Sequence, residues 1–115
     1  MLQNYILYFK FEVADNMTML LCYNEPNRPD QVNCPPKETA RYYKELNERY
    51  PDKIMISPAT GGADTDWFDE FYEECLIIGC RIDYLATHLY SGSPQERIEQ
   101  LKAYSERYIA NNYTV

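Results

Sequence analysis

Short apolar runs alternate with longer amphipathic stretches along this chain. The first clear run, Met19 to Tyr23, lacks a helical polar face and is stopped by Pro26. It therefore predicts a buried strand over Thr18 to Tyr23, followed by a polar loop. The apolar positions of Lys53 to Ser57 and of Ile82 to His88 predict two further strands of the same kind.

Three stretches with helical spacing follow these strands in turn. The first runs from Pro36 to Tyr50, and the second begins with Asp66 as its N-cap and ends at Gly79. The third is opened by Ser93-Pro94. Their apolar stripes are Ala40, Tyr43, Leu46 and Tyr50; Phe68, Phe71, Tyr72, Cys75 and Ile78; and Ile98, Leu101, Tyr104 and Tyr108.

The order of elements from Thr18 onward is strand, helix, strand, helix, strand, helix. Such alternation predicts an α/β fold with parallel strands and right-handed crossovers. Tyr5 to Val13 is a candidate for a preceding strand. No linker interrupts the pattern, so residues 1–115 are interpreted as a single domain.

Charge and length exclude several classes of protein. The chain has 18 acidic and 11 basic residues in 115, a net charge of −7, which disfavours nucleic acid or an anionic membrane surface as a partner. No apolar stretch has the length of a membrane span. The N-terminal residues lack the pattern of a secretory signal.

Polar side chains that could take part in catalysis follow each predicted strand. Asn24 and Glu25 follow the first, residues 57–62 the second, and His88 with Tyr90 the third. Parallel strands bring these positions to one carboxyl-terminal edge, where α/β enzymes bind ligands. An acid beside an amide suits glycoside cleavage, because the acid can protonate the departing oxygen while the amide binds a sugar hydroxyl. Alternatively, Asn24 to Asn27 is a plain turn, and His88 is a buried histidine bonded to backbone.

Trp67 and the cysteines each admit two interpretations. Trp67 is either a platform for stacking a sugar or, as we favour, an anchor at the start of a helix. Cys75 and Cys80 flank Gly79 and could close a small disulfide, which would imply an oxidising compartment, or remain buried thiols. The spacing of the four cysteines and the single histidine does not fit a metal site.

Four blocks of this sequence resemble the glycosyl hydrolase catalytic core family, glycoside hydrolase family 128. They span roughly residues 18–108 and occur in the family's order: Leu21 to Asn27 (LCYNEPN), Ile56 to Ala59 (ISPA), Trp67 to Phe71 (WFDEF) and Gly79 to Tyr90 (GCRIDYLATHLY).

The resemblance implies a (β/α)8 TIM barrel, of which this chain would supply strands four to six. It implies an extracellular or cell-wall-associated protein that hydrolyses β-1,3-glucan without metal or cofactor. Glu25 matches the general acid/base, and Asn24, His88 and Tyr90 match residues that bind near the reacting sugar. Cys75 and Cys80 match a cysteine pair common before the sixth strand.

The sequence departs from the family where retaining cleavage needs a second carboxylate, roughly 5 Å from the acid. The family places this nucleophile on strand seven, whereas the chain ends at Val115, and Glu96, Glu99 and Glu106 fall in the last predicted helix. We therefore expect a fragment of a retaining glycoside hydrolase that does not hydrolyse efficiently on its own. Alternatively, it is a non-catalytic carbohydrate-binding remnant that uses Asn24, Trp67, His88 and Tyr90.

Overall fold

The fold was analysed in a computed structural model that describes residues 14–108. The candidate strand from Tyr5 to Val13 lies outside these residues. The elements are β1 (Met19–Leu21), α2 (Pro36–Arg49), β2 (Ile54–Ile56), β3 (Thr60–Gly61), α3 (Thr65–Ile78), β4 (Thr87–His88) and α4 (Pro94–Tyr108).

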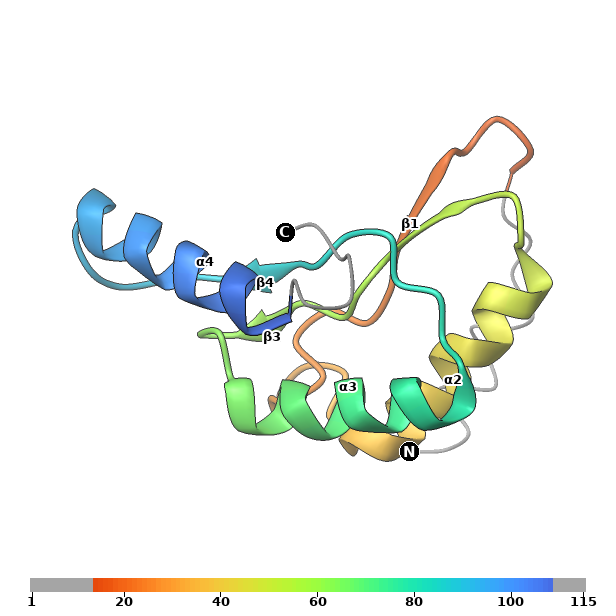
Figure 1. Ribbon diagram of the computed structural model, residues 1–115, viewed down its shortest axis with the longest axis horizontal. Helices are drawn as coiled ribbons and strands as arrows, with labels where there is room; N and C mark the ends of the chain where they lie inside the picture. Colours follow the sequence, from red (N-terminus) through yellow and green to blue (C-terminus); the bar gives the residue numbers. More distant parts are fainter. Residues whose placement is uncertain (1–13, 109–115) are drawn as a thin grey trace.

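Both strand pairs in the described residues are parallel. β1 pairs with β2 in the register Leu20↔Met55, and β3 pairs with β4 in the register Gly61↔His88. Single parallel bridges, Asn24↔Ala59 and Ile56↔Tyr84, extend the pairing between these short strands. Figure 1 shows the strands running together, with α2 and α3 below them and α4 at the end of β4. This confirms the predicted α/β order with parallel strands.

The third predicted strand, Ile82 to His88, is mostly irregular, and only Thr87–His88 forms a regular pair. The cause is Asp83, whose carboxylate accepts the Met55 N–H at 2.7 Å. The backbone N–H groups of Asp83 and Tyr84 both donate to the Met55 carbonyl. A side chain therefore takes the place of one backbone partner, and the ladder is reduced to the bridge at Tyr84.

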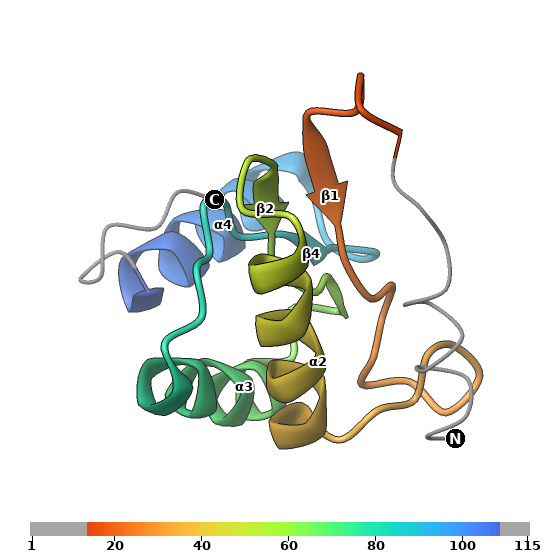
Figure 2. The same ribbon diagram turned by 90° about the vertical axis from the view of Figure 1, so that its right-hand side faces the viewer.

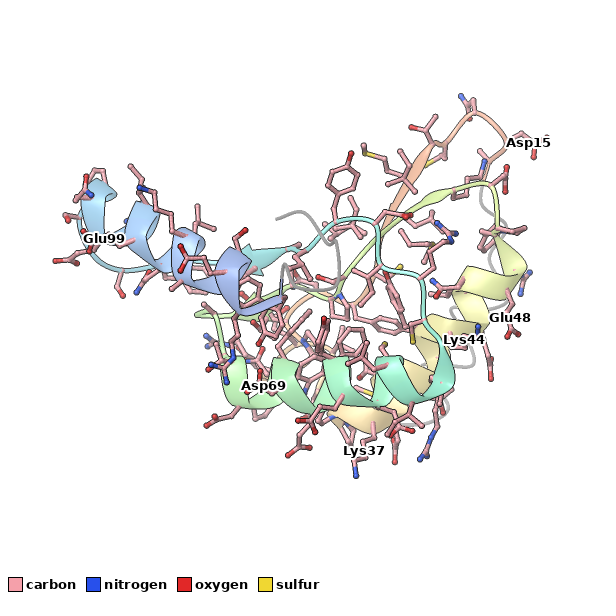
Figure 3. All side chains as sticks on the ribbon, in the orientation of Figure 1. Asp15, Lys37, Lys44, Glu48, Asp69 and Glu99 are labelled. Atoms are coloured by element: carbon pink, nitrogen blue, oxygen red, sulfur yellow. The ribbon has the colours of Figure 1, made fainter. Side chains whose placement is uncertain are left out.

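The core lies between the strands and two helices. Tyr43 of α2, Phe68 and Phe71 of α3 and Met55 of β2 are fully buried. The Tyr43 and Phe71 rings meet edge to face at 5.5 Å, an arrangement that aromatic pairs favour. Figure 2 shows α2 and α3 crossing beneath the strands. Charged side chains such as those of Lys37, Lys44 and Glu48 lie on the outer side of α2 (Figure 3).

The N-cap of helix α3 lies two residues before the predicted one. Asp64, not Asp66, is the N-cap, because its Oδ1 accepts the Trp67 N–H at 3.1 Å. Asp66 instead adds a negative charge to the first turn, where the helix dipole favours one. Gly79 ends the helix in the left-handed conformation, φ 79°, as the sequence predicts.

Helix α4 is packed at its C-terminal end only. Tyr104 and Tyr108 are buried, and both rings contact Phe68 of α3. Ile98 and Leu101, the other members of its predicted apolar stripe, are 47% and 39% exposed. Figure 1 shows the reason, since the N-terminal half of α4 extends away from the other elements.

Within residues 14–108, no helix covers one apolar side of the strands. Leu20 and Met55 point toward the helices, whereas Met19 and Leu21 are 50% and 64% exposed, so the prediction of a fully buried first strand is wrong. Paired residues of neighbouring strands share a face. The register therefore defines an open face that consists of Met19, Leu21, Ile54, Ile56 and Tyr84.

Candidate active site

Glu25 lies just beyond β1 and is only 5% exposed. Its Oε1 is 2.8 Å from Nδ1 of His88, and its Oε2 is 3.7 Å from Nε of Arg28. A buried carboxylate is tolerated only when partners replace its water, and here each oxygen has one. The structure thus holds an acidic side chain, with its two oxygens in different surroundings, at the carboxyl ends of the strands.

The backbone at Glu25 is unusual. Glu25 and Tyr23 have φ values of 45° and 66°, in the left-handed region that L-residues other than glycine rarely adopt. Such a residue costs roughly 1–2 kcal/mol. The Glu25 N–H donates to the Ala59 carbonyl at 2.8 Å, which holds this conformation in place. Strain that surrounding contacts maintain is typical of functional positions.

His88 reaches Glu25 from 63 positions away in the sequence. It lies at the end of β4, and its side chain is 34% exposed, so the alternative of a fully buried structural histidine does not apply. Its Nδ1 is also 3.1 Å from the Tyr90 hydroxyl, and Tyr90 is 60% exposed. The predicted convergence of the first and third strand ends is therefore observed.

One proton can be shared between Glu25 and His88. When Glu25 is ionised, Nδ1–H of His88 can donate to Oε1; when Glu25 is protonated, its O–H can donate to the Nδ1 lone pair. The Tyr90 hydroxyl lies 3.1 Å from the same Nδ1 and can act as a second acceptor of its N–H when Glu25 is ionised. The three groups can thus hold an acidic proton next to an exposed tyrosine.

Three further residues frame Glu25, and of these only Gly61 lies in a segment, residues 57–62, that the sequence placed at this edge. Arg28 contacts its carboxylate, and Asn27 bonds to the backbone of Gly61. A Cβ on Gly61 would lie 2.7 Å from Cδ of Arg28 and 3.3 Å from Cδ of Glu25, so a larger residue there would require the Arg28 side chain to move. Gly61-Gly62 after the second strand was a visible signal, but it was interpreted as a loop.

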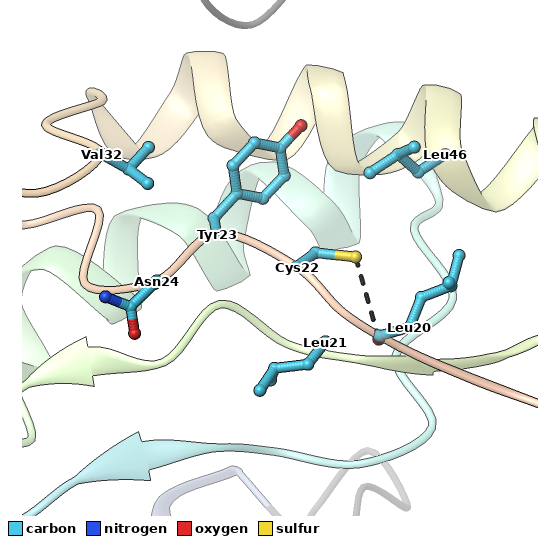
Figure 4. A pocket seen from close by; sticks show the side chains of 7 residues that line it. All are labelled: Leu20, Leu21, Cys22, Tyr23, Asn24, Val32 and Leu46. Carbon is cyan, nitrogen blue, oxygen red and sulfur yellow. Dashed lines mark hydrogen bonds between the residues drawn. The ribbon is translucent and has the colours of Figure 1, made fainter. Parts of the chain in front are cut away.

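Asn24 is not brought to the Glu25 carboxylate. Its amide donates to Oε1 of Gln31 at 3.1 Å in the following loop. It also lines a pocket of about 340 Å³ whose other walls are mostly apolar (Figure 4). The lining residues are Leu20, Leu21, Cys22, Tyr23, Asn24, Val32 and Leu46. Few of these side chains could bind sugar hydroxyls.

Trp67 is used within the protein. Its indole N–H donates to the Cys34 carbonyl at 3.1 Å, and its ring stacks on Phe71 with centroids 5.7 Å apart. The N–H of the indole and one face of its ring are therefore occupied. These contacts support the anchor interpretation over the sugar platform.

Cys75 and Cys80 are free thiols in the structure, as in the second of the two interpretations, and the disulfide stays a prediction. Gly79 does provide the expected turn, since the N–H groups of Gly79 and Cys80 both reach the Cys75 carbonyl. However, Sγ of Cys80 lies 3.6 Å from the Ala40 carbonyl. Burial raises the pKa of the Cys75 thiol above its ordinary value, which favours the protonated form. The oxidising compartment likewise stays a prediction.

Residues 14–108 contain no cluster of three or more histidine, cysteine or acidic side chains that could hold a metal. Within the same residues, every helix is too short or too polar to cross a bilayer.

Comparison with known proteins gives one family. The model of the family described as glycosyl hydrolase catalytic core matches residues 5–113 of this chain. None of the curated proteins compared with the chain matches it.

Several solved structures are similar to this one. A curdlan-specific exo-β-1,3-glucanase of glycoside hydrolase family 128 from Blastomyces gilchristii, solved with glucose, is 30% identical over 83% of this chain and 42% of its own, with a TM-score of 0.65. An endo-β-1,3-glucanase from Amycolatopsis mediterranei, solved with laminaritriose, is 25% identical over 79% of this chain and 40% of its own, with a TM-score of 0.70. An endo-β-1,3-glucanase from Sorangium cellulosum is 24% identical over 84% of this chain and 44% of its own, with a TM-score of 0.71. This chain thus spans less than half the length of each.

Proposed function

Because the chain belongs to the glycosyl hydrolase catalytic core family, we propose that it is part of a β-1,3-glucan-hydrolysing (β/α) barrel in which Glu25 is the general acid/base. The observation that carries this proposal is the buried Glu25 carboxylate at a strand end, 2.8 Å from His88. A glycosidase needs such an acid, held away from water beside the scissile bond.

The choice of β-1,3-glucan rests on the solved structures. The proteins from Blastomyces gilchristii and Amycolatopsis mediterranei are an exo- and an endo-β-1,3-glucanase, and the second was solved with laminaritriose. Since this chain covers less than half of each, the activity of a whole barrel is an extrapolation from a segment. The parallel strand pairs and outer helices agree with three consecutive units of such a barrel.

We assign the residues the following roles. Protonated Glu25 donates its proton to the departing glycosidic oxygen, and His88 then supports the carboxylate that remains. Tyr90 offers an exposed ring and hydroxyl to the sugar, and Asn24 binds it only if its bond to Gln31 is released. The nucleophilic carboxylate that a retaining reaction requires would come from a strand other than the three represented here. An extracellular or cell-wall location, where a glucan polymer would be reached, belongs to the same proposal.

The test is binding and cleavage of laminarihexaose by the 115-residue chain. We expect weak binding without efficient hydrolysis, because the site holds the acid but not a partner nucleophile. Glu25→Gln should bind about as well as the unaltered chain, since the amide preserves shape and the His88 contact, whereas Tyr90→Ala should bind less well. Cellohexaose, with the same sugar in β-1,4 linkage, is the matched control for the ligand.

Two results would contradict the proposal in different ways. If the unaltered chain hydrolysed laminarihexaose and Glu25→Gln did not, Glu25 would be the acid, but the chain would already have a complete catalytic pair. Equal behaviour toward laminarihexaose and cellohexaose, or no binding of either, would remove the assignment to β-1,3-glucan.

A further inference from the structure

We propose that Asn27 is a positioning residue that fixes the Glu25 carboxylate against His88 by supplying the last rung of the sheet with its side chain. The inference rests on the proposed function for its significance, but its geometry is independent of any substrate. Nothing in the family match or in the similar structures assigns this role.

Asn27 bonds to both backbone groups of one residue. The Gly61 N–H donates to Oδ1 of Asn27 at 2.8 Å, and Nδ2 of Asn27 donates to the Gly61 carbonyl at 3.1 Å. In a parallel sheet the N–H and C=O of one residue point to the same neighbouring strand. The Asn27 amide, which has one acceptor and two donor hydrogens, therefore occupies the place of a peptide group of that strand.

The side chain is needed because the backbone leaves the sheet here. The Glu25 N–H makes the last backbone rung, to the Ala59 carbonyl, and Glu25 then turns in the left-handed conformation. Pro26, which follows, has no N–H to donate. Gly61 lies two residues beyond Ala59 and faces the same side, so without Asn27 its polar groups would lose this partner.

The Asn27 amide is held in one orientation. Its Nδ2 also donates to Oδ2 of Asp64 at 3.2 Å, and Oδ1 of Asp64 caps helix α3. A carboxylate can only accept, so this contact fixes which end of the amide is the nitrogen. The loop that carries Glu25 is thereby tied both to β3 and to the start of α3.

This tie determines how Glu25 meets His88. Gly61 is the register partner of His88, and the Gly62 N–H donates to the His88 carbonyl at 3.0 Å. Asn27 thus joins the strand pair that carries His88 to the loop that carries Glu25, two residues from the carboxylate. Loss of the Asn27 bonds should loosen the 2.8 Å contact between Glu25 and His88 without removing either group.

The experiment uses the single histidine as a reporter. In the 115-residue chain labelled with ¹⁵N-histidine, His88 gives the only imidazole signals, and its Nδ1 shift reports the hydrogen bond to Glu25. Glu25→Ala, which removes the hydrogen-bond partner of His88, provides the reference for a lost contact. We expect Asn27→Ala to move the Nδ1 shift more than halfway toward that reference, and the exposed Asn16→Ala to leave it unchanged.

Asn27→Asp is the second variant, and it allows the test to be made even if Asn27→Ala does not fold. It preserves shape and the acceptor for the Gly61 N–H, but it loses both donors and sets a carboxylate against Asp64. Its shift should lie between those of the unaltered chain and Asn27→Ala. Circular dichroism confirms that each variant is folded.

A folded Asn27→Asp or Asn27→Ala chain with the His88 shift of the unaltered protein would overturn the inference. This result is distinct from failure of the proposed function. Loss of the Glu25–His88 contact is detected by NMR without substrate, whereas glucan recognition is tested by binding to the unaltered chain.

Discussion

At the residue scale, Cys75 and Cys80 are neighbouring free thiols on either side of the turn at Gly79. The thiol of Cys80 also approaches the Ala40 carbonyl of α2 at 3.6 Å. Burial raises the pKa of Cys75, and it raises the pKa of Cys22 to about 12. Buried thiols of this kind stay protonated and unreactive at neutral pH.

We therefore predict that a disulfide-exchange reagent added to the folded chain modifies Cys80, the least buried cysteine, first. Cys22, Cys34 and Cys75 should react only as the protein unfolds, because their thiols are buried. The measurement is the time course of thiol release in buffer and in denaturant. A total below four thiols in denaturant, for protein prepared without reductant, would show that a disulfide had formed.

At the residue scale, Glu25 and His88 were identifiable from the sequence because each directly follows an apolar run. The pairing of Asn27 with Gly61 was not, because nothing in a linear sequence shows that an amide side chain will pair with a backbone 34 positions away. Asn24 was predicted at the site, but neighbouring residues at a strand end point to opposite sides, and only Glu25 points toward His88.

At the scale of elements, one acidic side chain of α3 bonds to two residues of α4, next to the aromatic contacts that Tyr104 and Tyr108 make with Phe68. Asp69 accepts hydrogen bonds from Nε of Arg107 at 2.9 Å and from the Tyr108 hydroxyl at 2.8 Å. Figure 3 shows Asp69 on the part of α3 that lies near α4. The hydrogen bond from Arg107 is the main cause that lowers the pKa of Asp69 below its ordinary value, and the Tyr108 hydrogen bond adds to it.

The contact of Asp69 with Arg107 predicts that the fold is less stable at low pH. A carboxylate whose pKa is lower in the folded state stabilises the fold above its ordinary pKa of about 3.9, and this contribution is lost as the pH falls through the lower folded value. For so exposed a pair, the loss should be no more than about 1 kcal/mol. The measurement is the free energy of unfolding in urea at about pH 6 and about pH 3.

Asp69→Asn is the matched control for that measurement. It preserves the shape of the side chain and removes the charge, so its unfolding free energy should change less with pH than that of the unaltered chain. Equal pH dependence in both proteins would show that other carboxylates cause the acid effect.

The helices were well predicted because apolar stripes of helical period, a proline at the start and a glycine at the end are local signals. The third strand was predicted too long because its pairing depends on Asp83, whose carboxylate replaces a backbone partner for Met55. The stripe of α4 was predicted in full, but packing covers only Tyr104 and Tyr108. Periodicity identifies which side of an element is apolar, not whether another element covers it.

At the scale of the whole molecule, the open face is an exposed apolar surface of the strands within residues 14–108. Met19, Leu21 and Tyr84 are 50%, 64% and 40% exposed, and Ile54 and Ile56 lie between them. A contiguous apolar surface of this kind favours association with another apolar surface. In a closed barrel, side chains in these positions fill the interior.

We predict that the 115-residue chain self-associates as its concentration rises, and that Leu21→Lys weakens this by about tenfold or more, since burying a leucine is worth about 1.5–3 kcal/mol. Sedimentation velocity over a concentration series measures the effect. Ile77→Lys is the matched control, because Ile77 is 77% exposed but lies on α3, away from the open face. Equal weakening by both changes would show that association does not depend on the strands.

The left-handed backbone of Glu25 sets the stability of the fold against the presence of an acid at this position. A glycine at this position would adopt φ 45° without strain and would leave no carboxylate to bury. Thermodynamic stability alone therefore disfavours glutamate here, by roughly 1–2 kcal/mol for the backbone conformation. For the acid role that we propose for Glu25, position 25 is thus the point at which activity and stability compete, and a chain optimised only for folding would be expected to lose this acid first.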